Sequence, residues 1–198
     1  MLGAAGALDT VTFGDTGTHA VSSVESVVGT SGTDVLQLLA GGGVAITTIE
    51  TVLGSTGTDV VTMLTAGTLA VSDVESVIGS ADTTDEITML TEGTISLAGI
   101  ESVTGTTGDD RVNIAGGGSI TVSGGSDAVD SIVGSNNAVE IVTLAASAGS
   151  TVTVNMIDSV IGSAGSDVLR VGAGTISVSA IESVLGTTGV AEVVQLLD

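Results

Sequence analysis

One short element returns seven times along this chain with only conservative changes. It reads VESVVG, IETVLG, VESVIG, IESVTG, VDSIVG, IDSVIG and IESVLG, and its acids are Glu25, Glu50, Glu75, Glu101, Asp130, Asp158 and Glu182. Steps of 24 to 29 residues separate these acids. A repeat of this length is typical of a solenoid, in which each unit covers only its neighbours. We therefore predict a single repeat domain over residues 1–198.

Composition indicates that the repeats are built from β-strands. The chain has 30 glycines, no proline and many Val, Ile, Thr and Ser residues, a mixture that favours strands joined by tight turns. Each unit shows three apolar segments separated by Gly-rich or Ser/Thr-rich corners, for example residues 35–39, 44–47 and 49–52. We interpret these as three strands per coil. The predicted fold is all-β: a right-handed parallel β-solenoid of about 7.5 coils of about 25 residues.

The strands alternate between inward and outward residues. In the first strand of a unit, Leu36 and Leu38 are expected inside and Val35 and Gln37 outside. In the third strand, apolar residues stand at positions such as Val74, Val77 and Ile78, which do not alternate. This strand either bends near Ser76 or carries an outward ladder of valines. Extra length in two units, at residues 123–128 and 145–151, is expected to bulge from the corners.

Charge limits the possible partners. The chain has 23 acidic and two basic residues, for a formal net charge of -21. Phosphate backbones and anionic membrane surfaces would repel such a chain, so neither nucleic acid nor a membrane is an expected partner, and no apolar run is long enough for membrane insertion. Metal cations are the natural partners. There is no cysteine, and the N-terminal residues lack the basic region of a signal peptide.

The corner between the third strand and the next first strand carries a recurring motif. It reads GTSGTDVL from Gly29, GSTGTDVV from Gly54, GTTGDDRV from Gly105 and GSAGSDVL from Gly162. This motif resembles the glycine-aspartate nonapeptide of hemolysin-type (RTX) calcium-binding β-rolls, which are secreted bacterial proteins. The resemblance implies Ca²⁺ bound between turns by the aspartates and by the loop carbonyls. The matching positions are Asp34, Asp59, Asp110 and Asp167, with Gly29, Gly32, Gly54, Gly57, Gly105, Gly108, Gly162 and Gly165.

The motif departs from the family in three ways. Its second glycine is always Thr or Ser, it occurs once per about 25 residues, and four corners are irregular. In the irregular corners the acid stands one residue later, at Asp9, Asp85, Glu140 and Glu192. Calcium is therefore expected at the regular corners only.

The corner acids have a second interpretation that needs no metal. An aspartate at a turn can accept hydrogen bonds from the turn's own N–H groups. If coils stacked in register, however, like carboxylates would lie about 4.8 Å apart and repel by roughly 0.9 kcal/mol per pair even in water. A bridging Ca²⁺ would relieve that repulsion. The acids of the ESV elements are expected on a solvated outer face, or as a second line of cation sites.

Little in the sequence points to an enzyme. His19 is the one histidine, and its alignment with core positions favours a structural role near the end of the stack. Arg111 and Arg170 project from outward strand positions and need no catalytic role. A β-helix polysaccharide lyase and an ice-binding solenoid stay open as alternatives. Only Thr151 and Thr153 form a full Thr-x-Thr pair in the second strand.

The expected function is therefore structural. A solenoid ends in open strands, and no capping helix or loop is visible in this sequence. We expect an extracellular or cell-surface protein that stacks head to tail into calcium-stabilised filaments or a layer, with residues 8–13 continuing the ladder of residues 193–197 and Phe13 covering Leu196. The alternative is a repeat fragment of a longer calcium-binding adhesin.

Overall fold

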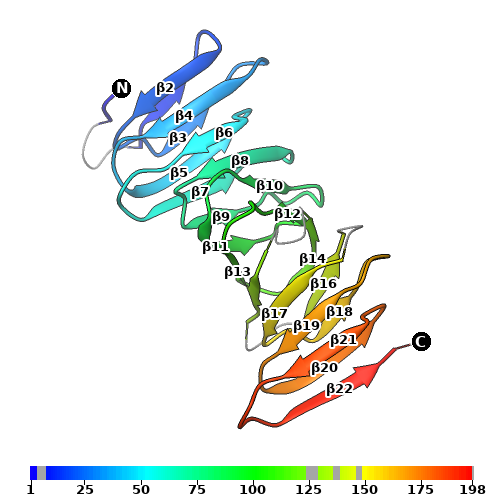
Figure 1. Cartoon of the computed structure of the whole chain (residues 1–198). Coiled ribbons are helices and arrows are strands. Elements are labelled where there is room, and N and C mark those ends of the chain that lie inside the picture. The colour runs from blue at the N-terminus through cyan, green and yellow to red at the C-terminus, as the bar shows by residue number, and fades with distance from the viewer. Residues whose placement is uncertain (4–7, 124–128, 136–138, 146–148, 198) are drawn as a thin grey trace.

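The chain folds as a parallel β-solenoid with two sheets. A computed structural model describes residues 1–3, 8–123, 129–135, 139–145 and 149–197. Within these ranges all regular structure is β-strand, and no helix is present that could cross a membrane. Successive strands alternate between two 11-stranded sheets, so that one turn consists of one strand from each sheet (Figure 1).

The odd-numbered strands form one sheet and the even-numbered strands form the other. The odd sheet contains β1 (Thr10–Thr12), β3 (Ser26–Val28), β5 (Gly42–Thr47), β7 (Asp59–Met63), β9 (Ser76–Ile78), β11 (Gly93–Ala98), β13 (Asp110–Ile114), β15 (Ser131–Val133), β17 (Thr151–Asn155), β19 (Val168–Val171) and β21 (Ser183–Gly186). The even sheet contains β2 (Gly17–Val21), β4 (Asp34–Leu38), β6 (Thr51–Leu53), β8 (Thr68–Ser72), β10 (Glu86–Met89), β12 (Ser102–Thr104), β14 (Gly118–Ser123), β16 (Glu140–Leu144), β18 (Ser159–Ile161), β20 (Gly174–Ser179) and β22 (Glu192–Leu196).

The parallel β-solenoid is confirmed, but the prediction of about 7.5 coils with three strands per coil is wrong. The structure has about ten turns of two strands each. Each sequence repeat does supply three strands, and three strands make one and a half turns. Consecutive repeats therefore place equivalent strands on opposite sheets: the ESV element of Glu50 starts β6 in the even sheet, and that of Glu75 starts β9 in the odd sheet.

Three kinds of strand follow one another in a fixed order. Corner strands start at or just after a corner acid, middle strands follow them along the chain, and ESV strands start at the Ser or Thr of the ESV element. Within each sheet the neighbours run corner, ESV, middle and then corner again, as in β4, β6, β8 and β10. Two copies of the same kind of strand are therefore three turns apart in a sheet.

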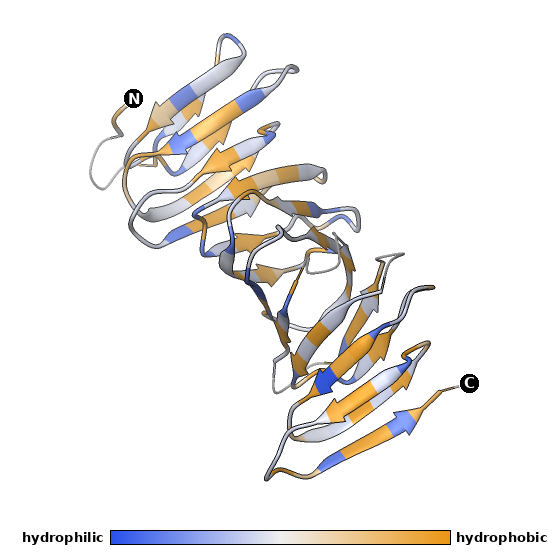
Figure 2. Ribbon diagram, viewed as in Figure 1, coloured by the Kyte–Doolittle hydropathy of each residue, from blue (hydrophilic) through white to orange (hydrophobic). Residues whose placement is uncertain are grey.

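The core lies between the two sheets and is built from the inward columns expected from the sequence. Leu36 and Leu38 of β4 are 0% and 7% exposed, while Gln37 between them is exposed. Middle strands contribute pairs such as Leu69 and Val71, which are also buried. Figure 2 shows apolar residues on the strands from one end of the stack to the other.

The ESV strands bend, and this settles the choice left open by their apolar pattern. Val74 and Val77 are both buried although they are three residues apart, whereas Ile78 is exposed. The bend follows a residue in the left-handed region two positions before the acid: Ser23, Thr48, Asp73, Met156 and Ala180 have φ between 50° and 56°, and Gly99 has φ 62°. Of these six residues only Gly99 adopts this conformation without steric cost, so no recurring glycine marks the turn in the sequence.

Two expectations lie beyond these observations. The extra residues at 123–128 and 145–151 fall largely outside the described ranges, so the predicted bulges are not described. The right-handedness of the coil stays a prediction.

Candidate functional site

Six of the eight corners hold a buried acid that is bound by the turn in front of it, at Asp34, Asp59, Asp85, Asp110, Glu140 and Asp167. At the start of β7, Asp59 is 0% exposed. Its Oδ2 accepts hydrogen bonds from the backbone N–H of Ser55 at 2.6 Å and from the Ser55 hydroxyl at 3.0 Å. The Ser55 hydroxyl in turn accepts the N–H of Gly57 at 3.0 Å. The turn is thus closed by a short relay from N–H to hydroxyl to carboxylate.

The same relay explains the Thr or Ser that replaces the second glycine of the RTX-like motif. At each of the four regular corners, a Ser or Thr donates hydrogen bonds from both its backbone N–H and its side-chain hydroxyl to the acid. The pairs are Thr30 with Asp34, Ser55 with Asp59, Thr106 with Asp110 and Ser163 with Asp167. At these corners the N–H of the third glycine, Gly32, Gly57, Gly108 or Gly165, donates to that hydroxyl. A glycine in the second position could not form this relay.

Two irregular corners have the same arrangement. Ser80 donates its N–H and hydroxyl to Asp85, and Ser135 donates both to Glu140, five residues later instead of four. Asp85 and Glu140 are both 0% exposed. At a third irregular corner the Thr187 N–H donates to Glu192, whereas the Thr187 hydroxyl donates to the carbonyl oxygen of Val171. The extra residue lengthens the turn, and the acid still caps it.

Each acid of an ESV element caps the corner acid of the same repeat, one turn earlier. The Asp34 N–H donates to Glu50 Oε2 at 2.7 Å, and the two residues are 16 positions apart. All seven ESV acids do this, in the pairs Asp9–Glu25, Asp34–Glu50, Asp59–Glu75, Asp85–Glu101, Asp110–Asp130, Glu140–Asp158 and Asp167–Glu182. They are half-buried or exposed, as expected, but they have a structural role that the sequence did not reveal.

The predicted ladder of like carboxylates does not form. In register, Gly42 of β5 is beside Asp59, whose N–H donates to Glu75 of the next turn. Ser76, the residue after Glu75, then pairs with Ser96 of β11, which follows the apolar Ile95. Carboxylates therefore stand in pairs, one corner acid and one ESV acid, separated by turns without an acid at that position. The repulsion that motivated a continuous line of cations is limited to these pairs.

The first glycine of the corner motif is required by packing. A Cβ on Gly29, Gly54 or Gly162 would overlap the carbonyl oxygen of the left-handed residue in the next turn, namely Thr48, Asp73 or Ala180. The same close approach occurs at Gly79 and Gly134 of irregular corners. Gly105 donates its N–H to the Ser123 carbonyl. The glycine pattern that resembles a calcium loop thus has a structural cause in this chain.

Whether a cation could bind at the corners depends on which carboxylate oxygens of the corner acids are free of hydrogen bonds. One oxygen of each of the six buried corner acids, regular or irregular, accepts from an N–H and an O–H donor. The other accepts an N–H in Asp85, Asp110 and Asp167, and it is buried without a partner in Asp34 and Asp59, as is Oε2 of Glu140. Calcium needs six to eight oxygen ligands. In the described ranges no three acidic or histidine side chains gather around one point, so the corners fit carboxylate capping better than a calcium shell, and calcium binding stays a prediction.

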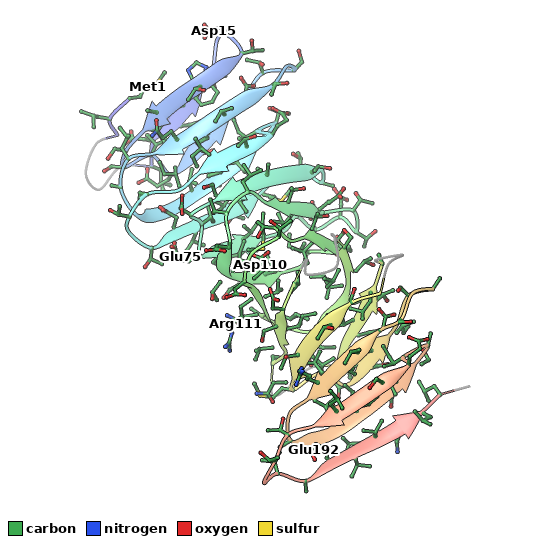
Figure 3. The ribbon with its side chains drawn as sticks, viewed as in Figure 1. Met1, Asp15, Glu75, Asp110, Arg111 and Glu192 are labelled. Atoms are coloured by element: carbon green, nitrogen blue, oxygen red, sulfur yellow. The ribbon has the colours of Figure 1, made fainter. Side chains whose placement is uncertain are left out.

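The other residues considered from the sequence take no part in the hydrogen bonds that cap the corners. His19 of β2 stacks on Phe13 with ring centroids 3.9 Å apart, and its Nε2 lies 3.0 Å from the Asp15 carbonyl oxygen, so it packs at the N-terminal end as expected. Arg111, next to Asp110, points away from the ribbon and donates to Asn113 (Figure 3). Thr151 and Thr153 lie beside Val168 and Arg170, so no second Thr-x-Thr row adjoins them there.

Shallow grooves recur beside the ESV acids. One of about 140 Å³ is lined by Asp73, Glu75 and Glu92, and one of about 240 Å³ includes Asp158. Neither is lined by a basic residue that could pair with the acids.

In comparisons with protein-family models, curated proteins and solved structures, the chain matches none. The resemblance to RTX proteins therefore rests on the corner motif and on the stacked parallel strands alone.

Proposed function

We propose that this chain is an extracellular structural protein that extends end to end into filaments or a surface layer. The observation that carries the proposal is the apolar surface of its last turn. Val193, Val194, Leu196 and Leu197 of β22 and the residue after it are 37% to 77% exposed. Figure 3 places Glu192, the first residue of β22, at the opposite end of the molecule from Met1.

Two of these side chains, Val194 and Leu196, occupy columns that are buried in the corner strands β4, β7, β10, β13, β16 and β19. Leu196 is 77% exposed, whereas its equivalents Leu38 and Met63 are 7% and 5% exposed. Each further turn would cover such a column. Burying one leucine side chain contributes about 1.5–3 kcal/mol, so covering this end is a substantial driving force for association.

The N-terminal end also presents apolar side chains, since Met1, Leu2 and Leu8 are 60%, 85% and 90% exposed. The junction expected from the sequence, with Phe13 covering Leu196, does not fit. Phe13 is only 5% exposed because it is stacked on His19 of its own chain. Moreover, no corner strand is paired with another corner strand in either sheet, as β1 on β22 would require.

Self-association tests the proposal. We expect sedimentation to show growth with protein concentration and electron microscopy to show unbranched fibres. Leu196→Asp should weaken association at least tenfold, because it places a charge on the exposed end. Leu64→Asp is the matched control, since Leu64 is 55% exposed but lies beside the middle of the stack. Monomers at every concentration, or equal association of both variants, would contradict the proposal.

The alternative proposal is that further repeats of a longer adhesin cover the same end. This alternative rests on the same apolar surface. It would be favoured if the chain alone stays monomeric and further repeats added to it raise its stability.

Calcium stiffening of the corners is a separate part of the proposal, supported by the motif and by the buried, unpartnered oxygens of Asp34 and Asp59. We expect millimolar Ca²⁺ to raise the melting temperature more than Mg²⁺ at equal ionic strength, because calcium accepts the more irregular oxygen shell. Asp34→Asn should reduce that difference. Equal effects of the two ions, or no change on chelation, would show that the corners are metal-free turns.

A further inference from the structure

The order of strands specifies what can be added to the C-terminal end of the stack. In both sheets a corner strand is always followed by an ESV strand, and an ESV strand by a middle strand. β21 is an ESV strand at the edge of the odd sheet, and β22 is a corner strand at the edge of the even sheet. The next strand on β21 should therefore be a middle strand, and the next on β22 an ESV strand.

The hydrogen bonds at the corners single out the ESV strand. Seven corner acids have their N–H capped by an ESV acid at 2.6 to 2.9 Å. Glu192 is the eighth corner acid, and within the described residues no carboxylate caps its N–H. A strand added to β22 in the register of β21 on β19 would bring an acid to this N–H, a valine beside Val194 and the glycine of the ESV element beside Leu196.

The N-terminal end of a second copy supplies this surface only in part. Leu2 is bridged to Ser22, and the Gly3 N–H donates to the Ser22 carbonyl as the Gly54 N–H does to Ser72. Residues 1–3 thus occupy the last positions of an ESV strand, without its acid. Two copies joined directly would also leave the position beside β21 without a middle strand.

We infer that the edge formed by β21 and β22 binds a middle strand followed by an ESV strand, supplied by another chain with repeats of this kind. The partner sequence has the form Gly-Thr-apolar-Ser-apolar-Ser, then one residue at the left-handed position, then apolar-acid-Ser-apolar. Residues 174–186 of this chain, GTISVSAIESVLG, are one such segment. The inference rests on the proposed end-to-end role because both use the same open end, and it names the segment that completes the contact.

A synthetic peptide of residues 174–186 tests this inference with the full chain. We expect one labelled peptide to bind per chain by fluorescence anisotropy, and the amides of residues 193–197 to become protected from hydrogen exchange. A peptide with Glu182→Gln should bind about tenfold more weakly, because it loses the charge-assisted hydrogen bond to the Glu192 N–H. Leu196→Asp in the chain should abolish binding, whereas Leu64→Asp should not.

Equal binding of a scrambled peptide, several peptides per chain, or protection confined to other strands would overturn the inference. Failure of the two proposals is distinguishable. A chain that forms fibres but ignores the peptide refutes the strand assignment alone. A chain that binds the peptide but never self-associates refutes the filament proposal alone.

Discussion

Replacing Gly54 by alanine should destabilise the solenoid by at least about 3 kcal/mol, a fall of roughly 10 °C in melting temperature. A Cβ on Gly54 would overlap the carbonyl oxygen of Asp73 in the next turn. The obstacle is backbone, so no side chain can rotate away. The shift would also disturb the hydrogen bond from the Gly54 N–H to the Ser72 carbonyl, which is 2.8 Å long.

Gly43→Ala is the matched control for this substitution. Gly43 lies in β5, its φ is not positive, and no heavy atom lies within 4 Å of the Cβ that alanine would add. We expect a change within about 0.5 kcal/mol, because alanine fits this position without strain. If the Gly54→Ala and Gly43→Ala variants have the same melting temperature, the close contact between Gly54 and the next turn is not real.

Replacing Asp59 by alanine should cost about 3 kcal/mol in unfolding free energy. The substitution removes the acceptor for the Ser55 N–H and the Ser55 hydroxyl and leaves these donors unsatisfied in a buried corner. Asp59→Asn should cost less, because an amide oxygen can still accept both hydrogen bonds. Chemical denaturation of the variants measures the difference.

Asp109→Ala is the control for the change in net charge. Both alanine variants change the net charge from -21 to -20, but Asp109 is exposed and its side chain has no recorded hydrogen bond in the described structure. Relief of negative repulsion should leave Asp109→Ala as stable as the parent chain or slightly more stable. Equal stability of Asp59→Ala and Asp109→Ala would mean that the corner acid does not cap its turn.

Much of the fold could be predicted from the sequence because strand alternation is a local property. The inward positions of Leu36 and Leu38 follow from period two, whatever the strand is paired with. The number of strands in a turn is not local. Nothing in a single repeat shows that β4 pairs with β6 of its own repeat, and the regular step of about 25 residues suggested a turn of that length.

One signal for the true turn was present. Asp34 and Glu50, like Asp59 and Glu75, are 16 residues apart, and that spacing is one turn of the solenoid. The motif identifies the corner acids, but in the motif their hydroxyl partners are only departures from the glycine pattern. Spacing alone does not show that Ser80 and Asp85 form the same cap as the regular corners, because they are five residues apart instead of four.

The advance of one and a half turns per repeat can be tested with two pairs of engineered cysteines, since the chain has none of its own. Gln37 and Leu53 are register partners in β4 and β6, and neighbouring strands lie about 4.8 Å apart, within reach of a disulfide. Gln37 and Thr62 are 25 residues apart, as stacked equivalents in a 25-residue coil would be, but they face outward from opposite sheets. We expect the double variant Gln37→Cys with Leu53→Cys to form an intramolecular disulfide on mild oxidation, and Gln37→Cys with Thr62→Cys to keep both thiols free. A disulfide between positions 37 and 62, with none between 37 and 53, would contradict the two-sheet register.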